Sequence, residues 1–514
     1  MASPLLAQDY DVVSLIQHAY HDKLLAPDNT YLTPQDVLSA PGDLAQTLVY
    51  AVGCHAGLSL PDAPNGSLGL DFPQAFTQCG APLVANTGYG WATRYAVGLT
   101  ERLALYFSQA LAPAPGSTTT IGQALRDAKR RYYLAAWRFD AYDAKVLNEM
   151  TLYGLPMYTL STPIGPSQPV NTPLLPTTPV TITYTTADTS RITDYESRIT
   201  NDEWGNVYSD VQSTQSVDAS LPPFVTQASI QFQFPEENYA ISDVGEARYY
   251  SYLGEAQANR GMPLLPRFSF GVSIPGARTQ GVLFAGGTYS DVFALPVTTT
   301  AVISESLGEN PVSDYVPGQW YPTVLQLVNQ LADGGDDRLT MSLGNMRQGI
   351  GPGGEEVTPT QRLYNNVAFE VYYYNQLAEG VPDRTPPQVT EVLTDVVAGT
   401  VHVSVGVDDV LGAGDTQVLG VWRVVVAYTS NASGVGQWES QELGYNAVTQ
   451  RWEGSIATTP QDANPVLLIV QAVDRGGNVS ADDNEGWYYQ IPASALVDVD
   501  RHQIYLPVVM RQSG

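Results

Sequence analysis

In the stretch Leu48-Val49-Tyr50-Ala51-Val52-Gly53-Cys54-His55-Ala56-Gly57-Leu58, a short apolar run stops on a cysteine beside glycines. A run of this length, bounded by turn residues, predicts a fully buried strand of a parallel sheet. Open α/β sheets place their chemistry at the carboxyl ends of such strands. Cys54, one of only two cysteines in the chain, stands at that end. If the protein has an active site, we expect it here.

The segments on either side of this stretch alternate between buried strands and helices. Thr33 and Pro34 suit the cap and the first turn of a helix, so about one helical turn is expected after them. Further strands are expected at 9–16 and 82–86, and helices at 73–78, 95–111, 119–136 and 143–152. Strands with helices between them predict an α/β fold.

The overall composition excludes some classes of partner. The net charge of −28 argues against nucleic acid and anionic membrane surfaces. Hydrophobic residues make up 44% of the chain, which is enough to bury real cores. No segment approaches the roughly eighteen consecutive apolar residues of a transmembrane helix, and no signal peptide is visible. A bridge between Cys54 and Cys79 would consume the residue at the strand end, so we expect both thiols to be free.

The composition changes after the first part of the chain. Residues 1–150 carry 9 Lys and Arg against 13 Asp and Glu, so −24 of the net charge falls on the lysine-free remainder. That remainder alternates short apolar runs with turns, as secreted β-proteins do. We therefore predict a multidomain, extracellular or cell-surface chain. Its expected parts are a partial α/β domain (1–162), a Pro/Thr-rich linker (163–179), a β-sandwich with one short helix near 321–331 (180–381), an immunoglobulin-like or fibronectin-like β-sandwich (385–492) and a tail (493–514).

Two of the five histidines, His18 and His21, follow the first expected strand. If that strand and the one ending at Cys54 are parallel neighbours, His18 and Cys54 emerge side by side, as a Cys–His dyad requires. His55 is poorly placed, because successive side chains on an extended segment point apart. On the residues alone, the more frequent role of such a cysteine is a small core residue, and of such histidines a loop position. A metal site from His18, His21 and Asp22 lacks further ligands, so no metal is expected there.

A set of motifs follows in order along the first part of the chain. It consists of Gly53-Cys54-His55-Ala56-Gly57-Leu58 with Pro61-Asp62, Phe76 with Gly80-Ala81, Asn86-Thr87-Gly88-Tyr89-Gly90, Glu101-Arg102-Leu103, Gly122-Gln123-Ala124-Leu125 and Leu152-Tyr153-Gly154-Leu155-Pro156. With these motifs, residues 5–160 resemble the second half of the catalytic domain of gingipain-type cysteine peptidases. That family has a caspase-like fold, whose earlier strands and helices would precede the start of this chain.

The resemblance implies that a Cys–His dyad hydrolyses peptide bonds in a protein or peptide substrate. Cys54 is then the nucleophile and His18 the base, with His21 as the alternate base. The backbone N–H groups of Ala19 and Cys54 would bind the oxyanion. Ala19 stands where the family often has glycine.

The resemblance also implies a substrate pocket beside the nucleophile. Thr87, Gly88 and Trp91 would line it, and plain packing is an equal expectation for Trp91. We therefore predict a secreted cysteine endopeptidase, or a truncated version of one, held by its β-sandwiches to a cell surface or polymer. The alternative is a non-catalytic surface or adhesion protein with a degenerate peptidase-like domain and binding β-sandwiches.

Acidic residues of the last sandwich raise the question of calcium, which prefers oxygen ligands. The residues concerned are Asp408, Asp409, Asp415 and Asp474. A solvated acidic rim is the main interpretation, and calcium is the alternative. No other cofactor is expected.

Overall fold

The structure is a computed structural model, and the chain folds mostly into β-sheets. It describes residues 10–25, 30–40, 42–60, 69–111, 118–160, 177–187, 209–299, 301–302, 318–331, 336–350, 354, 356–375, 381–397, 399–430, 436–457, 465–492 and 496. The motif Pro61-Asp62, most of the predicted linker and all of the predicted tail except Leu496 lie outside these residues.

The first part of the chain forms a four-stranded sheet. Its order is β1 (Val12–Leu15), β5 (Leu48–Ala51), β6 (Leu83–Asn86) and β8 (Met150–Tyr153). The first three strands are parallel, with Val13 beside Val49 and Val49 beside Leu83. The strand predicted before Cys54 is therefore present and lies inside the sheet, with the strand that precedes His18 as its direct neighbour.

Helices cover both faces of this sheet. The helices α2 (Pro34–Leu38) and α3 (Phe72–Gln78) pack on the face that carries Val49 and Ala51. The helices α4 (Leu99–Leu111), α5 (Ile121–Leu134) and α6 (Ala141–Glu149) pack on the face that carries Leu48 and Val84. Because strand side chains alternate between faces, a fully apolar strand suits a sheet buried on both sides. The predicted α/β layering is observed.

The cap predicted for the first short helix is present. The Thr33 hydroxyl accepts a hydrogen bond from Asp36 N, while the Asp36 carboxylate accepts one from Thr33 N at 2.8 Å. This reciprocal pair satisfies N–H groups that a helix start would otherwise leave unpaired. Pro34 occupies the first turn, where its missing N–H costs nothing.

Two predicted helices are wrong in part or whole. The helix expected at 143–152 ends at Glu149, and the residues from Met150 onward form β8, antiparallel to β6. The helix expected near 321–331 is the strand β18 (Gln326–Asn329), paired with β19 (Arg338–Ser342). Both short apolar segments lack a distinguishing period, and in each case tertiary pairing with a neighbouring strand determines the structure.

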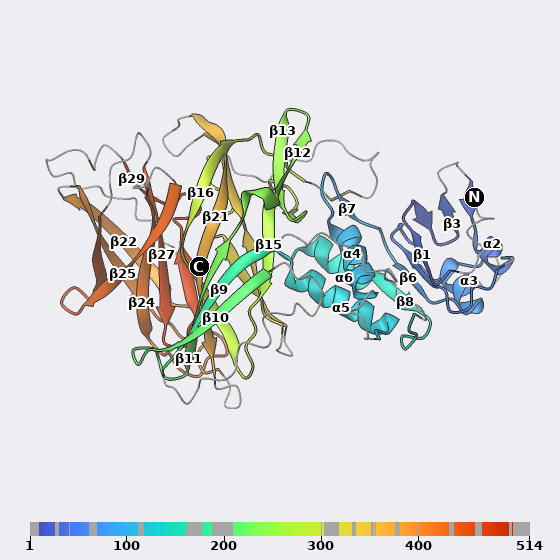
Figure 1. Ribbon diagram of the computed structural model, residues 1–514, viewed down its shortest axis with the longest axis horizontal. Coiled ribbons are helices and arrows are strands. Elements are labelled where there is room, and N and C mark those ends of the chain that lie inside the picture. Colours follow the sequence, from blue (N-terminus) through green and yellow to red (C-terminus); the bar gives the residue numbers. More distant parts are fainter. Residues whose placement is uncertain are drawn as a thin grey trace.

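Further sheets complete the two main parts of the molecule. They are built from β2 (Ala19–Tyr20), β3 (Lys23–Leu25) and β4 (Tyr31–Leu32); β12 (Tyr239–Val244) and β13 (Ala247–Tyr252); β14 (Ala256–Gln257) and β15 (Leu265–Gly271) with β19 and β18; and β7 (Ala92–Thr93) with β17 (Ala301–Val302). The last pair joins the α/β part to the β-rich part. In Figure 1, α4, α5 and α6 lie between the four-stranded sheet and the β-rich part.

The β-rich part contains one sheet that runs through both predicted sandwiches. Its main path is β10 (Ser209–Val217), β9 (Thr178–Thr186), β11 (Val225–Gln233), β21 (Glu356–Tyr374), β16 (Arg278–Phe293), β25 (Gly436–Asn446), β24 (Val421–Ser430), β27 (Val466–Asp474) and β28 (Val479–Asp482). Branches add β20 (Gly344–Ile350), β22 (Gln388–Val397), β23 (Thr400–Asp408), β26 (Arg451–Ala457) and β29 (Tyr489–Ile491). The predicted domain boundaries remain predictions. The strand β16 of the first predicted sandwich pairs with β25 of the second, so backbone hydrogen bonds join the two.

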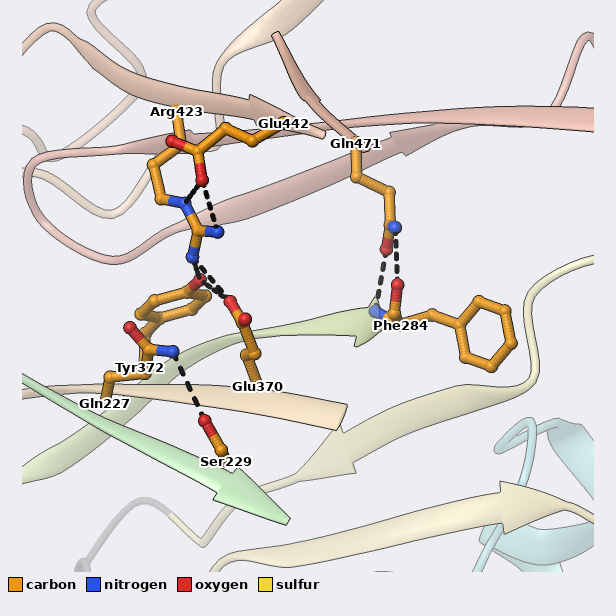
Figure 2. Close-up of polar contacts among 8 residues, drawn as sticks. All are labelled: Gln227, Ser229, Phe284, Glu370, Tyr372, Arg423, Glu442 and Gln471. Atoms are coloured by element: carbon orange, nitrogen blue, oxygen red, sulfur yellow. Dashed lines mark hydrogen bonds and ion pairs between the residues drawn. The ribbon is translucent and has the colours of Figure 1, made fainter. Parts of the chain in front are cut away.

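Polar side chains reinforce this junction (Figure 2). The Gln471 side-chain amide accepts a hydrogen bond from Phe284 N and donates one to Phe284 O, both at 2.8 Å, as the backbone of a neighbouring strand would. Arg423 forms one ion pair with Glu370 at 2.5 Å and another with Glu442 at 2.8 Å, and so links the two segments. The largest hydrophobic core also contains residues from both sides of the junction. The two predicted sandwiches are therefore joined by shared backbone pairing and a shared core.

Candidate active site

Cys54 lies at the carboxyl end of the central strand β5. Val52 N donates to Leu15 O at 2.9 Å, so β5 and β1 stay paired up to this point. The chain then turns through Gly53 to Gly57, and Gly57 N donates to Asn86 O at 2.8 Å, which ties the turn to β6. Cys54 is half-buried, and it is a free thiol, as is Cys79.

His18 follows β1 on the segment that touches this turn. A Cβ added to Gly53 would meet Gln17 O and would lie 2.6 Å from Ala19 Cβ. Such a close approach requires glycine at position 53. The residues flanking His18 therefore pack against the residue that precedes Cys54. The His18 side chain is exposed, and its carbonyl accepts from Leu25 N at 2.9 Å as the β2–β3 hairpin begins.

His21 and Ala19 occupy different parts of this hairpin. His21 lies in its turn, and the His21 carbonyl accepts a hydrogen bond from Phe72 N at 3.0 Å, at the start of α3. Ala19 is buried, and its backbone nitrogen lies 3.3 Å from the position of a Cβ on Gly53. The Ala19 N–H is therefore close to the Cys54 turn. His18 directly precedes Ala19, whereas His21 lies two residues beyond it, in the turn of the hairpin.

The loop after β6 wraps around the Cys54 turn. His55 N donates to Gly88 O at 2.6 Å, and His55 Nδ1 lies 3.4 Å from Thr87 O. The Asn86 side chain donates to Val52 O at 3.0 Å. Thr87 and Gly88, both predicted pocket residues, are thus next to the cysteine turn. His55 has a φ of 57°, so the backbone at this residue is left-handed and not extended as expected. Its ring lies against this loop.

Trp91 packs against an aromatic and a basic side chain of α6. Its ring lies 4.8 Å from the Tyr142 ring at 78°, and the Lys145 ammonium lies 5.2 Å from the Trp91 ring centre. Its indole Nε1 is buried with no hydrogen-bond partner among the described residues. The packing role expected for Trp91 is therefore present, and the pocket role stays a prediction.

Glu149 is a member of this site that the sequence analysis missed. A Cβ on Gly88 would lie 2.5 Å from the Glu149 carboxyl carbon, so glycine leaves room for that carboxylate. One of its oxygens is buried with no partner among the described residues. Glu149 reaches this edge because β8 runs antiparallel to β6, which places the start of β8 beside the end of β6. The only sequence signal was an acidic residue directly before a short apolar run.

The surroundings of Cys54 favour its protonated form. Burial raises the pKa of the Cys54 thiol, hydrogen bonding to the backbone at Gly90 and at Cys54 itself lowers it, and the nearby Glu149 charge raises it. The balance is an increase. Burial also raises the pKa of Glu149, against the attraction of Lys145 and His55. A nucleophilic role for Cys54 therefore needs a base, because the thiolate is the reactive form.

A second cluster of ionisable groups lies in the last β-rich segment. Carboxylate oxygens of Asp383, Asp409 and Asp474 lie within 4.8 Å of one another. Asp383 and Asp474 are fully buried, so a solvated rim does not describe them. Burial raises the pKa of Asp474 to about 7, although Asn478 donates hydrogen bonds to its carboxylate. One Asp409 oxygen is buried without a partner in the described part of the chain.

The other two predicted calcium residues have different surroundings. Asp408 is exposed at the end of β23. The Asp415 carboxylate accepts hydrogen bonds from Thr385 Oγ1 at 2.5 Å and Gly412 N at 3.0 Å, so it holds a turn together. Two of the four predicted residues, Asp409 and Asp474, are thus brought together. Their third partner, Asp383, lies between the two predicted β-sandwiches and was not among the predicted residues.

Comparison with known proteins gives few matches. No protein-family model matches the chain, and no curated protein matches it. A structure of the pro- and mature domains of RgpB from Porphyromonas gingivalis is 20% identical, with 28% of this chain and 78% of that chain covered at a TM-score of 0.22. A structure concerning the zymogenic latency of gingipain K from Porphyromonas gingivalis is 16% identical, with 29% and 87% covered and a TM-score of 0.22. Similarity at this level transfers no activity. No helix in the described ranges is long and apolar enough to cross a membrane.

Proposed function

We propose that the α/β part of this chain is a cysteine endopeptidase domain, in which Cys54 is the nucleophile and His18 the base. One observation carries the proposal: Gly53 packs against Gln17 and Ala19, the residues on either side of His18. Cys54 and His18 both stand just beyond the carboxyl ends of neighbouring parallel strands. Reactive groups in α/β sheets are ordinarily found at this edge. The ordered motifs of the sequence support the same assignment.

In the proposed reaction, His18 accepts the proton of the Cys54 thiol as the sulfur attacks the scissile carbonyl carbon. The negative charge that develops on the carbonyl oxygen is stabilised by the backbone N–H groups of Ala19 and Cys54. The C–N bond then breaks, and His18 returns the proton to the leaving amine. Water hydrolyses the resulting thioester and releases the acid. Because burial and Glu149 raise the pKa of the thiol, this chemistry depends on the base.

A labelling experiment on the full chain tests this proposal. A peptidyl acyloxymethyl ketone should label Cys54 at least about 100-fold faster than Cys79, since general-base catalysis contributes about 10²- to 10⁴-fold. Replacing His18 with alanine should remove this difference and abolish hydrolysis of a peptide library. In that variant, iodoacetamide labelling of Cys54 should increase with pH, because the raised pKa leaves little thiolate at neutral pH. Mass spectrometry of the labelled peptides measures each rate.

Two matched variants serve as controls for the labelling. Cys79→Ala and His21→Ala should leave both labelling and peptide hydrolysis unchanged. Equal, slow labelling of the two cysteines without any peptide hydrolysis would contradict the endopeptidase assignment. Loss of activity in His21→Ala with full activity in His18→Ala would instead make His21 the base.

The second candidate function is a non-catalytic surface protein whose β-rich part binds a ligand. A polar groove lined by residues of β16, β18 and β28 favours it. The two functions are compatible in one chain. We also propose an extracellular or cell-surface location, supported by the acidic, lysine-free β-rich part. Fractionation of cells that produce the protein, with detection in the medium or on the surface, tests this location.

Calcium at the carboxylates of Asp383, Asp409 and Asp474 is a further part of the proposal. Three carboxylates with one unpartnered buried oxygen form a donor set that suits a hard cation. Calcium at about 100 times its dissociation constant should raise the free energy of unfolding by about 2.7 kcal/mol. Thermal unfolding with calcium and with a chelator measures this effect. Asp409→Asn should remove the response and Asp408→Asn should keep it; an identical unfolding temperature with and without calcium would contradict the site.

A further inference from the structure

A groove of about 480 Å³ lies at the junction of the two β-rich segments. Three strands supply its walls: the start of β16, the strand β18 and the strand β28. Its volume is in the range of sites that bind small molecules. The groove is remote in sequence from Cys54, and nothing in the proposed peptidase chemistry uses it. It is lined by Arg278, Thr279, Gln280, Gly281, Val282, Val324, Gln326, Leu327, Val328, Gln330, Arg384, Asn478, Val479, Ser480 and Ala481.

Four polar side chains that line this groove have an unpaired buried atom. The atoms are Thr279 Oγ1, Gln280 Nε2, Gln326 Oε1 and Ser480 Oγ, none of which has a hydrogen-bond partner among the described residues. Thr279 is 2% exposed and Gln326 is 8% exposed, so these two are almost fully buried. Buried polar groups are ordinarily paired, and four exceptions around one groove indicate a ligand that pairs with them.

The chemistry of the four atoms is mixed. The Gln280 nitrogen is a donor and the Gln326 oxygen is an acceptor, whereas the hydroxyls of Thr279 and Ser480 can do both. A ligand with several hydroxyl groups meets this pattern, because each hydroxyl also donates and accepts. Apolar side chains such as Val324 complete the walls and can contact the C–H faces of such a ligand.

The charged side chains that line the groove are both positive. Arg278 and Arg384 line the groove and are exposed, and no carboxylate is among the lining residues. Neither guanidinium forms an ion pair within the described part of the chain, although the Arg384 charge helps to lower the pKa of Asp415. Two arginines at one mouth are unusual in a chain of net charge −28. A guanidinium binds a carboxylate through two parallel hydrogen bonds.

We propose that this groove binds a saccharide that carries a carboxylate, of the uronic-acid class. The sugar hydroxyls pair with the buried amides and hydroxyls, and the carboxylate pairs with Arg278 and Arg384 at the mouth. The inference does not depend on the peptidase proposal, because it uses none of the residues around Cys54.

The groove is built to keep its shape. A Cβ on Gly281 would lie 2.5 Å from Val479 Cγ2, so β16 and β28 approach each other as closely as a glycine allows. The Gln471 side chain holds Phe284 of β16 against β27 (Figure 2). Asn478 donates to Asp383 O at 3.2 Å and thereby fixes the turn before β28. A preformed site loses less conformational entropy when a ligand binds.

Calorimetric titration of the full chain with oligogalacturonate tests the inference, with the methyl-esterified oligosaccharide as a neutral comparison. The charged saccharide should bind at least about tenfold more tightly than the neutral one, and its affinity should fall as salt is added. The double variant Arg278→Gln with Arg384→Gln should lose at least about tenfold in affinity for the charged saccharide. Thr279→Val should weaken the binding of both saccharides, since valine has a similar shape to threonine but lacks the buried hydroxyl.

Arg248→Gln is the matched control, because Arg248 is an exposed arginine on the distant hairpin β12–β13. It should bind both saccharides as the unmodified chain does, and thermal unfolding of every variant should confirm that it folds. Absence of oligogalacturonate binding in the unmodified chain overturns the inference. Equal binding by the double arginine variant also overturns it, as does binding of peptides with a free C-terminal carboxylate in preference to the saccharide.

Discussion

Replacing Arg267 with methionine should lower the free energy of unfolding by about 3 kcal/mol and loosen the α/β part from the β-rich part. Arg267 lies on β15, and its side chain is only 3% exposed. It donates to Glu255 Oε2 and to Ala135 O, both at 2.5 Å, and to Tyr106 OH at 3.4 Å. Ala135 and Tyr106 belong to the helical layer of the α/β part. The buried guanidinium of Arg267 therefore links the α/β part to the β-rich part through hydrogen bonds.

The size of this effect follows from what the substitution leaves behind. Removing one partner of a buried ion pair costs about 3–5 kcal/mol, because the other partner remains without compensation. Glu255 is 38% exposed, so water can solvate part of its charge and the lower end of this range applies. Methionine fills similar space without donating a hydrogen bond. Urea unfolding followed by fluorescence measures the change.

The ion pair also predicts how stability depends on pH. Burial alone would raise the pKa of Glu255, but the charges of Arg267 and Arg102 outweigh burial and lower this pKa to about 2. A carboxyl group with a lowered pKa stabilises the folded state above its unfolded value of about 4.3, and this stabilisation is lost as the pH falls toward 2. Arg267→Met should therefore remove part of the acid sensitivity between pH 4 and pH 2.

Arg248 provides the control for this experiment as well. It pairs with Asp243 at 3.3 Å, and both side chains are well exposed. Exposed pairs contribute about 0–1 kcal/mol, so Arg248→Met should leave stability nearly unchanged. If both methionine variants unfold at the same urea concentration as the unmodified chain, Arg267 does not hold the two parts together.

Replacing Gly53 with alanine should reduce peptide hydrolysis by about 100-fold or more. The added Cβ would collide with Gln17 O and lie 2.6 Å from Ala19 Cβ, and both partners belong to the segment that carries His18. Relief of this collision requires the segment to move away from the Cys54 turn. A displacement of about 1 Å between catalytic groups costs about 10²-fold in rate. Stability should fall by about 1–3 kcal/mol, as for other overpacked sites.

Gly69→Ala is the matched control, because nothing lies within 4 Å of the position of its Cβ. It should retain the activity and the stability of the unmodified chain. The ratio kcat/KM for a peptide substrate and the rate of Cys54 labelling together measure the effect of each variant. Full activity in Gly53→Ala would mean that the contact between the two strand ends does not align Cys54 with His18.

Local sequence patterns were sufficient for several elements. The buried strand before Cys54, the helices that became α4 and α5, and the Thr33 cap all follow from short-range signals: an apolar run, a helical period and a capping pair. The adjacency of the strands before His18 and Cys54 was a condition of the dyad hypothesis, and the structure meets it, because β1 pairs with β5. Consecutive strands of an α/β sheet are often adjacent.

Other features had no local signal. No turn residue separates Glu149 from Met150, so the sequence pattern predicts that the helix continues where the antiparallel strand β8 begins. Asp383 likewise lies between the two predicted β-sandwiches, where no core residue was expected, although it is fully buried beside Asp474. In both cases the partner that determines the position is far away in the chain.

The sequence by itself thus determined that a cysteine ends a buried apolar strand and that a histidine follows the strand before it. These features depend on residues close together in the chain. Only the tertiary structure decided that Glu149 lies beside that cysteine, that Arg267 joins two parts of the molecule, and that one sheet continues through both β-rich segments and forms a polar groove. These features depend on strand direction and long-range pairing, which hydrophobic periodicity does not encode.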